Sequence, residues 1–228
     1  MKERIFAHLT KPYVVIIVMA LAPVFAMADR NFGYFFGLGV ALLILWSSGR
    51  DWSRFGLAEK LSKATLVKAL LYAILIYIVV DICIQPFLEI YFGEIDLSSI
   101  EEIRGNFISF LILMVIMWVF AAFGEEFLFS GYYMKHLAEF FGNSDRAWLA
   151  SVVILSIYFG ASHSYQGTAG QIAVGLASVF YFFMFYKNRT NLALLIFMHG
   201  FYDSIGLTMI YLNQDKIWFN LVSGMMNS

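Results

Sequence analysis

The chain has 228 residues, of which 61% are hydrophobic, 18% aromatic and only 14% charged. A soluble domain is about half apolar and about a quarter charged, so this composition excludes an ordinary soluble domain and is typical of a polytopic membrane protein. The formal net charge of −1 gives no reason to expect a nucleic-acid partner. A single cysteine, Cys83, excludes a disulfide framework within the chain and a zinc site built from cysteines.

Seven apolar stretches follow one another along the chain. A helix needs about 20 mainly apolar residues to cross about 30 Å of hydrocarbon, and an open strand could not satisfy its backbone hydrogen bonds in lipid. The stretches that reach or nearly reach this length are 12–28, 33–48, 66–91, 106–134, 147–164, 168–186 and 190–212. The sequence therefore predicts an all-α bundle of about seven transmembrane spans, with eight as the alternative count.

Short polar connectors separate these stretches. Gly49 stands where a glycine is expected after a helix end, and Ser144 is expected to cap the helix that follows it. Residues 51–64 mix charged and apolar side chains, so we expect this segment to lie along the membrane interface. The part before residue 106 is thus predicted to consist of N-terminal spans with one interfacial segment.

The distribution of basic residues predicts the orientation of the spans. If the N-terminus is cytoplasmic, twelve of the 15 lysine and arginine residues fall inside, and only Arg30, Arg104 and Lys216 fall outside. We therefore expect a cytoplasmic N-terminus. The basic start, the apolar stretch and Ala26–Met27–Ala28 also resemble a signal peptide with its cleavage site. Cleavage there would remove the first span and leave the topology of the others unchanged.

Ionisable residues occur inside three of the apolar stretches, where a charge is costly unless it is paired or lines a wet cavity. They are Glu125 and Glu126 in GEEFLFSGYY, His163 in YFGASHSYQG, and His199 with Asp203 in LIFMHGFYD. At about 1.5 Å per residue, Glu125 and His199 each lie about 15 Å from a flanking cytoplasmic basic residue, and His163 about 25 Å. A tilted helix, or one that begins later, would bring His163 level. This convergence predicts one intramembrane polar cavity.

Spacing within each stretch adds detail. His199 and Asp203 are four residues apart and share a helix face, so both can meet one partner. Phe159 has the same spacing from His163, which places an aromatic ring beside the imidazole. The adjacent glutamates point about 100° apart on a helix, so one should face the cavity while the other needs a separate partner.

These three segments resemble the signature of the CPBP intramembrane proteases, which join type II CAAX prenyl proteases with bacterial Abi (bacteriocin-immunity) proteins. The family pattern is EExxxR, then FxxxH, then HxxxN or HxxxD. It is filled in order by Glu125–Glu126, by Phe159 with His163, and by His199 with Asp203. The resemblance implies a protease core over residues 106–205, followed by the end of the last span and a C-terminal tail over 206–228.

The resemblance also implies a reaction. An endopeptidase of this kind hydrolyses peptide bonds with an activated water, for which Glu125 would be the general base. His163, His199 and Asp203 would hold the water and the tetrahedral intermediate, with Glu126 in support. A carboxylate in an apolar cavity and imidazole donors to an oxyanion both suit this chemistry. The preferred mechanism requires no cofactor. In the alternative, Glu125, His163, His199 and Asp203 bind Zn²⁺, with water in an open position.

One residue departs from the pattern, because Ser130 stands where the motif has arginine. An arginine there would pair with Glu126 on the same helix face, whereas serine offers only a short hydroxyl. We therefore expect Glu126 to be protonated, hydrogen-bonded elsewhere or exposed to water. The departure motivates a second hypothesis, a catalytically weakened relative that acts as a bacteriocin-immunity or scaffold protein.

Substrate and compartment follow only in outline. A third hypothesis, a small proton-coupled carrier, has only the buried acids in its favour, because the chain lacks paired broken helices in two matching halves. The expected partners are the lipid bilayer and a peptide or membrane-protein tail, since nothing in the sequence identifies an isoprenoid groove. The compact chain suggests a bacterial plasma membrane protein.

Overall fold

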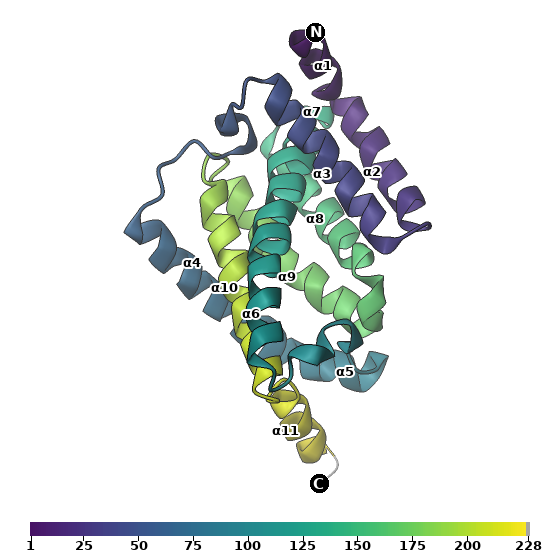
Figure 1. Ribbon diagram of the computed structural model, residues 1–228, viewed down its shortest axis with the longest axis vertical. Helices are drawn as coiled ribbons and strands as arrows, with labels where there is room; N and C mark the ends of the chain where they lie inside the picture. The colour runs from purple at the N-terminus through teal and green to yellow at the C-terminus, as the bar shows by residue number, and fades with distance from the viewer. Residues whose placement is uncertain (227–228) are drawn as a thin grey trace. The chain divides into compact units, whose positions relative to one another are not determined.

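The computed structural model describes residues 1–226, and its regular elements are helices (Figure 1). Within this range no strand forms; Leu57 and Asn191 make one isolated bridge. The predicted all-α class is therefore confirmed. The chain divides into two compact units, and the division falls in the connector after Leu61 and within helices η4, α8, α9 and α10. Each unit is described by itself.

The first unit comprises residues Met1–Leu61, Gly124–Leu155 and Phe182–Ala193. Its complete helices are α1 (Lys2–Leu9), α2 (Pro12–Ala26), α3 (Arg30–Ser47), η1 (Trp52–Phe55) and α7 (Lys135–Phe140). It also contains the later part of η4 (Met117–Met134), the first part of α8 (Asp145–Ser162) and the end of α9 (Gly167–Lys187).

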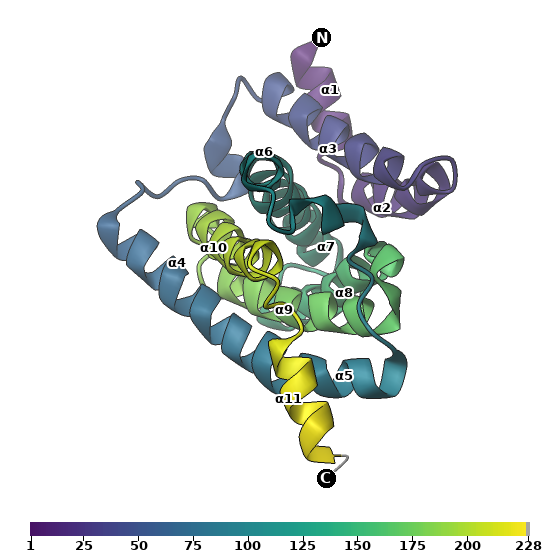
Figure 2. The same ribbon diagram turned by 60° about the horizontal axis from the view of Figure 1, so that its bottom comes forward.

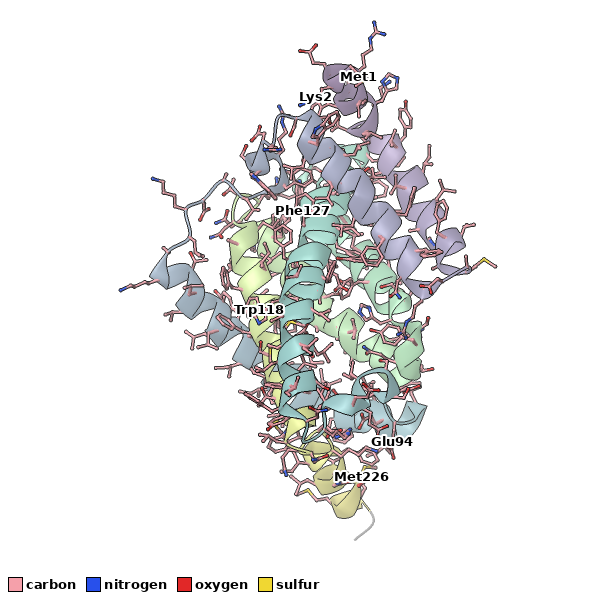
Figure 3. The ribbon with its side chains drawn as sticks, viewed as in Figure 1. Met1, Lys2, Glu94, Trp118, Phe127 and Met226 are labelled. Carbon is pink, nitrogen blue, oxygen red and sulfur yellow. The ribbon has the colours of Figure 1, made fainter. Side chains whose placement is uncertain are left out.

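Helices α2 and α3 lie side by side in this unit (Figures 1 and 2). Pro12, which lacks a backbone N–H, starts α2, and the chain bends by 75° between α1 and α2. Apolar side chains of both helices are buried, among them Val15 and Ile44. Nearer the core, the ring of Phe127 on η4 stacks on Phe55 of η1 at 4.3 Å (Figure 3). Burial of apolar surface thus holds this unit together.

The second unit comprises Ser62–Phe123, Ser156–Tyr181 and the described chain from Leu194 onward. Its elements are α4 (Lys63–Ile76), η2 (Tyr77–Ile84), α5 (Gln85–Phe92), η3 (Ser98–Ile103), α6 (Phe107–Ile116), η5 (Ser164–Gln166), most of α10 (Leu192–Tyr211) and α11 (Ile217–Met226). It also holds the start of η4, the end of α8 and most of α9. In Figure 2, α4 runs on through η2 into α5 as one long helix.

Polar contacts tie together the end of the second unit that carries α5 and α11. The Arg104 guanidinium donates two hydrogen bonds to the Asp215 carboxylate, at 2.5 and 2.8 Å. Lys216 pairs with Glu94, which Figure 3 labels. The backbone N–H of Gly105 donates to the carbonyl of Tyr211 at 3.0 Å. These bonds join the connector between α5 and α6 to the connector between α10 and α11.

Five helices in the described residues are long and apolar enough to cross a membrane, or six if the bent pair α1 and α2 counts as one. Each of the seven predicted stretches is helical, but the predicted number of spans is not confirmed. Helix α2 has only 15 residues. Helix α8 begins with Asp145 and Arg146 and contains three serines, which lower its hydropathy. The apolar helices nevertheless make the chain an integral membrane protein.

The outer faces of the long helices are apolar. On α6, Ile108 is 70% exposed and Val115 is 64% exposed, and exposed leucine, isoleucine and phenylalanine side chains surround them. Continuous apolar surface of this kind is unusual in a soluble monomer and suits contact with lipid.

The connectors behave largely as expected. Ser144 caps α8, because its hydroxyl accepts a hydrogen bond from the Ala147 N–H at 3.2 Å. Gly49 follows the end of α3 with a positive φ of 79°. Within residues 51–64, the Glu59 carboxylate accepts hydrogen bonds from Asn188, Thr190 and Asn191. The placement of this segment at the membrane interface stays a prediction.

Candidate functional site

The acidic pair lies on η4, in its part that belongs to the first unit. Glu126 is only 2% exposed, and Ser130 is completely buried. The Ser130 hydroxyl donates a hydrogen bond of 2.6 Å to Glu126 Oε2. Glu126 was expected to be protonated, hydrogen-bonded elsewhere or exposed to water, but the serine itself supplies a partner, because four residues of helix bring its hydroxyl directly to the carboxylate. Exposure of Glu126 to water is likewise excluded.

Glu125 has a different environment from its neighbour. It is half-buried, and it interacts electrostatically with the Tyr34 hydroxyl of α3. One turn further along α3, a Cβ on Gly37 would lie 2.3 Å from the hydroxyl of Tyr133 on η4. A glycine is thus required for α3 to pass so close to η4. The two glutamates therefore have different partners, whereas the cavity that one of them is expected to face stays a prediction.

Helix η4 is a π-helix from Met117 to Met134. In a π-helix each N–H bonds the carbonyl five residues back, which widens the turn, and such turns are rare except at functional sites. The acidic motif therefore lies on a π-helical backbone. The separation of about 100° expected for the adjacent residues Glu125 and Glu126 applies to an α-helix and not to this segment.

The histidine of the third motif lies on α10, in the second unit. His199 is 5% exposed, and its Nε2 is 3.4 Å from Asp203 Oδ2, one turn along the same helix. The prediction that the two side chains share a face is confirmed. An acidic neighbour of this kind orients an imidazole and favours one tautomer or its protonated form.

Aromatic rings enclose His199. Tyr181 of α9 stacks on the imidazole with 4.8 Å between ring centroids and an interplanar angle of 15°. Phe159 of α8 meets it edge-on at 6.3 Å. The next residue, Gly200, permits close packing of Trp118, because an added Cβ would lie 2.4 Å from that indole (Figure 3). The Trp118 Nε1–H donates to Ser204 at 3.2 Å. Rings from α8 and α9 thus contact the imidazole, and Trp118 packs beside it against Gly200.

The sequence predicted that His163 lies inside a helix, but it lies just beyond the end of α8. Helix α8 ends at Ser162, and His163 stands in the connector before η5. The polar run SHSYQG, with Gly167 at a φ of 78°, ends the helix two residues earlier than predicted. The predicted contact with Phe159 is present, at 4.8 Å between ring centroids.

The hydrogen bonding of His163 determines which nitrogen carries its proton. Its Nδ1 is 2.9 Å from the carbonyl oxygen of Phe159. A carbonyl can only accept, so Nδ1 is the donor, and in the neutral ring Nε2 is the acceptor. His163 also interacts electrostatically with His199 and Asp203. The second unit therefore brings three of the predicted site residues into one neighbourhood.

The sequence-based search missed a further acid in the second unit, Asp81. It lies in the π-helical segment η2, within the apolar run YIVVDICI. The Tyr202 hydroxyl donates a hydrogen bond to its carboxylate, and Asp203 interacts with it electrostatically. An aspartate in a 30-residue apolar helix is itself the signal that would have found it.

The five predicted site residues are divided between the units, with Glu125 and Glu126 in the first and His163, His199 and Asp203 in the second. Among residues 1–226, no group of three or more His, Cys, Asp and Glu side chains could hold a metal ion. His199 and Asp203 supply an imidazole and a carboxylate of the kind that zinc accepts. The four-residue zinc set stays a prediction.

Comparison with known families gives one match. Residues 107–205 match the family model described as "Type II CAAX prenyl endopeptidase Rce1-like". The matched segment contains all three motifs and ends two residues beyond Asp203. No curated protein and no solved structure matches the chain. Through residues 107–205, the chain is therefore similar to the Rce1-like type II CAAX prenyl endopeptidases, in agreement with the resemblance of its motifs to the CPBP proteases.

Proposed function

We propose that the chain is an intramembrane endopeptidase that hydrolyses a peptide or membrane-protein tail with an activated water. One observation carries the proposal: the family match includes Glu125, Glu126, His163, His199 and Asp203. The family is one of endopeptidases, and the chain is an integral membrane protein.

In this proposal, Glu125 accepts a proton from water as the oxygen attacks the carbonyl carbon of the scissile bond. Glu125 is the half-buried member of the acidic pair, so it is the more accessible of the two carboxylates. The same proton then passes to the nitrogen of the departing amine when the tetrahedral intermediate collapses. Water is consumed, one peptide bond breaks, and Glu125 returns to its starting form.

The imidazoles supply stabilisation of negative charge. A protonated His163 would donate Nε2–H to the oxyanion, because its Nδ1–H is already engaged by the Phe159 carbonyl. Asp203 Oδ2 lies 3.4 Å from His199 Nε2 and orients this ring, which would be a second donor to the same charge. Removal of one such donor typically lowers turnover by about 10²–10³-fold.

Glu126 has a supporting role. The Ser130 hydroxyl donates to one of its carboxylate oxygens, at the position where the CPBP motif pattern has arginine. A neutral donor replaces a cation, so the acidic pair keeps more negative charge than the motif pattern has. This arrangement supports an active peptidase over a weakened immunity or scaffold protein, because the carboxylate has a partner without the arginine.

The test is cleavage of internally quenched fluorogenic peptides by purified protein in lipid vesicles, with and without a C-terminal isoprenoid on the peptide. We expect Glu125→Gln to abolish cleavage, and His163→Ala and His199→Ala each to lower it by about 10²–10³-fold, without lowering expression. Matched controls are Glu139→Gln and His136→Ala, which remove an acid and an imidazole that bind each other on α7. Full activity in any of the three site variants would refute the assigned roles.

The weakened-relative alternative has its own signature. It predicts no cleavage by the wild-type protein and strong activation by Ser130→Arg. The metal alternative is decided by the zinc content of purified protein and by activity before and after chelation. An active, metal-free protein would exclude zinc as the source of the nucleophile.

A further inference from the structure

Asp81 is an acid that the family match leaves without a role, because it lies outside residues 107–205. Its Oδ2 atom is buried and has no hydrogen-bond partner in the described part of the chain. A carboxylate in an apolar span is destabilising by a few kcal/mol unless its surroundings compensate. An apolar side chain in this position would avoid that cost, so the identity of Asp81 needs an explanation beyond packing.

Helix geometry at Asp81 is also unusual. The flanking segments α4 and α5 are α-helical, whereas Tyr77–Ile84 is π-helical. A π-helical insertion rotates the residues that follow it relative to an unbroken α-helix, and such insertions often occur at functional sites. The backbone of the long helix thus changes at the turn that presents the carboxylate.

Two series of contacts connect Asp81 with His199 and Asp203. In the first, the Tyr202 hydroxyl donates to the Asp81 carboxylate, and Tyr202 is the residue directly before Asp203. In the second, the ring of Tyr202 meets Tyr181 edge-on at 6.4 Å, and Tyr181 stacks on His199. A substitution of Asp81 should therefore alter the positions of both His199 and Asp203, because Tyr202 lies between them and Asp81.

We propose that Asp81 is a positioning residue for His199 and Asp203. By accepting the Tyr202 hydrogen bond, it fixes the rotation of α10 at the turn that carries Asp203, and the tyrosine pair transmits this constraint to the His199 ring. Its role in catalysis rests on the function proposed above, whereas the constraint on His199 does not. Partners behind the reacting groups typically change activity by about 10–100-fold.

The hydrogen bond from Tyr202 to Asp81 can be removed by a substitution of either residue. Asp81→Ala removes the acceptor, and Tyr202→Phe removes the donor while keeping the ring. Asp81→Asn keeps an amide oxygen that can accept from Tyr202, so it should rescue most of the loss. The matched control is Glu89→Gln, which neutralises another half-buried acid of the same long helix, hydrogen-bonded by Gln85 rather than by α10.

Two readouts separate positioning from stability and from the proposed function. The first is kcat and KM for a fluorogenic peptide that the wild-type protein cleaves. The second is the ¹⁵N chemical shift of the His199 imidazole at one fixed pH in detergent micelles, which requires no substrate. Thermal unfolding of each variant shows whether the fold is intact.

We expect Asp81→Ala and Tyr202→Phe each to lower kcat by about 10–100-fold with little change in KM, and to shift the His199 resonances. The double variant should resemble either single variant, since one bond is lost in all three. Asp81→Asn and Glu89→Gln should stay close to wild type. Unchanged His199 resonances in folded Asp81→Ala or Tyr202→Phe would overturn the inference, as would an equal effect of Glu89→Gln. A wild-type protein without peptidase activity would refute the proposed function alone, because the resonances still decide the positioning role.

Discussion

Glu126 in the first unit obtains its partner in a different way from Asp81 and His199 in the second unit. Glu126 is bound by Ser130, one turn away on its own helix. Asp81 is bound by Tyr202, more than a hundred residues away, and His199 is enclosed by rings from two other helices. Glu126 is therefore supported by its own helix, whereas the partners of Asp81 and the rings around His199 depend on how helices pack. Substitutions should separate the two kinds of support.

The largest effect should come from His199→Ala. Loss of a donor to the oxyanion should lower kcat by about 10²–10³-fold, while the partner side chains on α8 and α9 remain in place. The measurement is cleavage of a fluorogenic peptide in vesicles, with Tm in detergent to show that the fold persists. A variant that retains wild-type kcat would mean that the enclosed imidazole is structural.

Gly200→Val should test the packing of the second unit most directly. The added side chain would collide with Trp118, so we expect a loss of about 1–3 kcal/mol in stability, together with reduced activity. Gly206→Val is the control, because on the same helix nothing lies within 4 Å of an added Cβ. Equal losses of Tm in both variants would indicate that helix propensity, rather than packing, sets the effect.

Ser130→Ala should have a smaller and purely local effect. It leaves the buried Glu126 without one donor, for a loss of about 1 kcal/mol that Ser130→Thr should partly restore. Thermal unfolding in detergent measures the change. If Ser130→Ala also shifted the His199 resonances, the support of Glu126 would not be local. The contrast between Glu126 and the residues around His199 would then fail.

The smallest effect should be that of Asp215→Asn, at the end of the second unit. The Arg104 guanidinium lowers the pKa of the Asp215 carboxyl below its ordinary value. A lowered folded-state pKa stabilises the protein fully above the unfolded-state value of about 3.9, and this contribution is lost as the pH falls through the lower folded-state pKa. Wild type should therefore exceed the variant in Tm at neutral pH, and the difference should disappear in strong acid. A difference that grew on acidification would contradict the pairing.

Local patterns were sufficient for the helices and for the residues of the motifs. Each of the seven apolar stretches is helical, Ser144 is an N-cap, and both predicted i, i+4 pairs are in contact. These features depend on the 3.6-residue repeat and on backbone hydrogen bonds within a few residues. The end of α8 was predicted two residues late, because a short polar run gives a weak stop signal within an apolar context.

The sequence by itself determined that this chain is a helical membrane protein and which family its three motifs indicate, since hydropathy and motif spacing are local properties. Only the tertiary structure decided which buried groups become partners. In the folded chain, Tyr202 donates a hydrogen bond to Asp81, Tyr181 stacks on His199, and Trp118 packs against Gly200. Contacts between helices depend on their rotation and packing, and one-dimensional periodicity does not specify either of these.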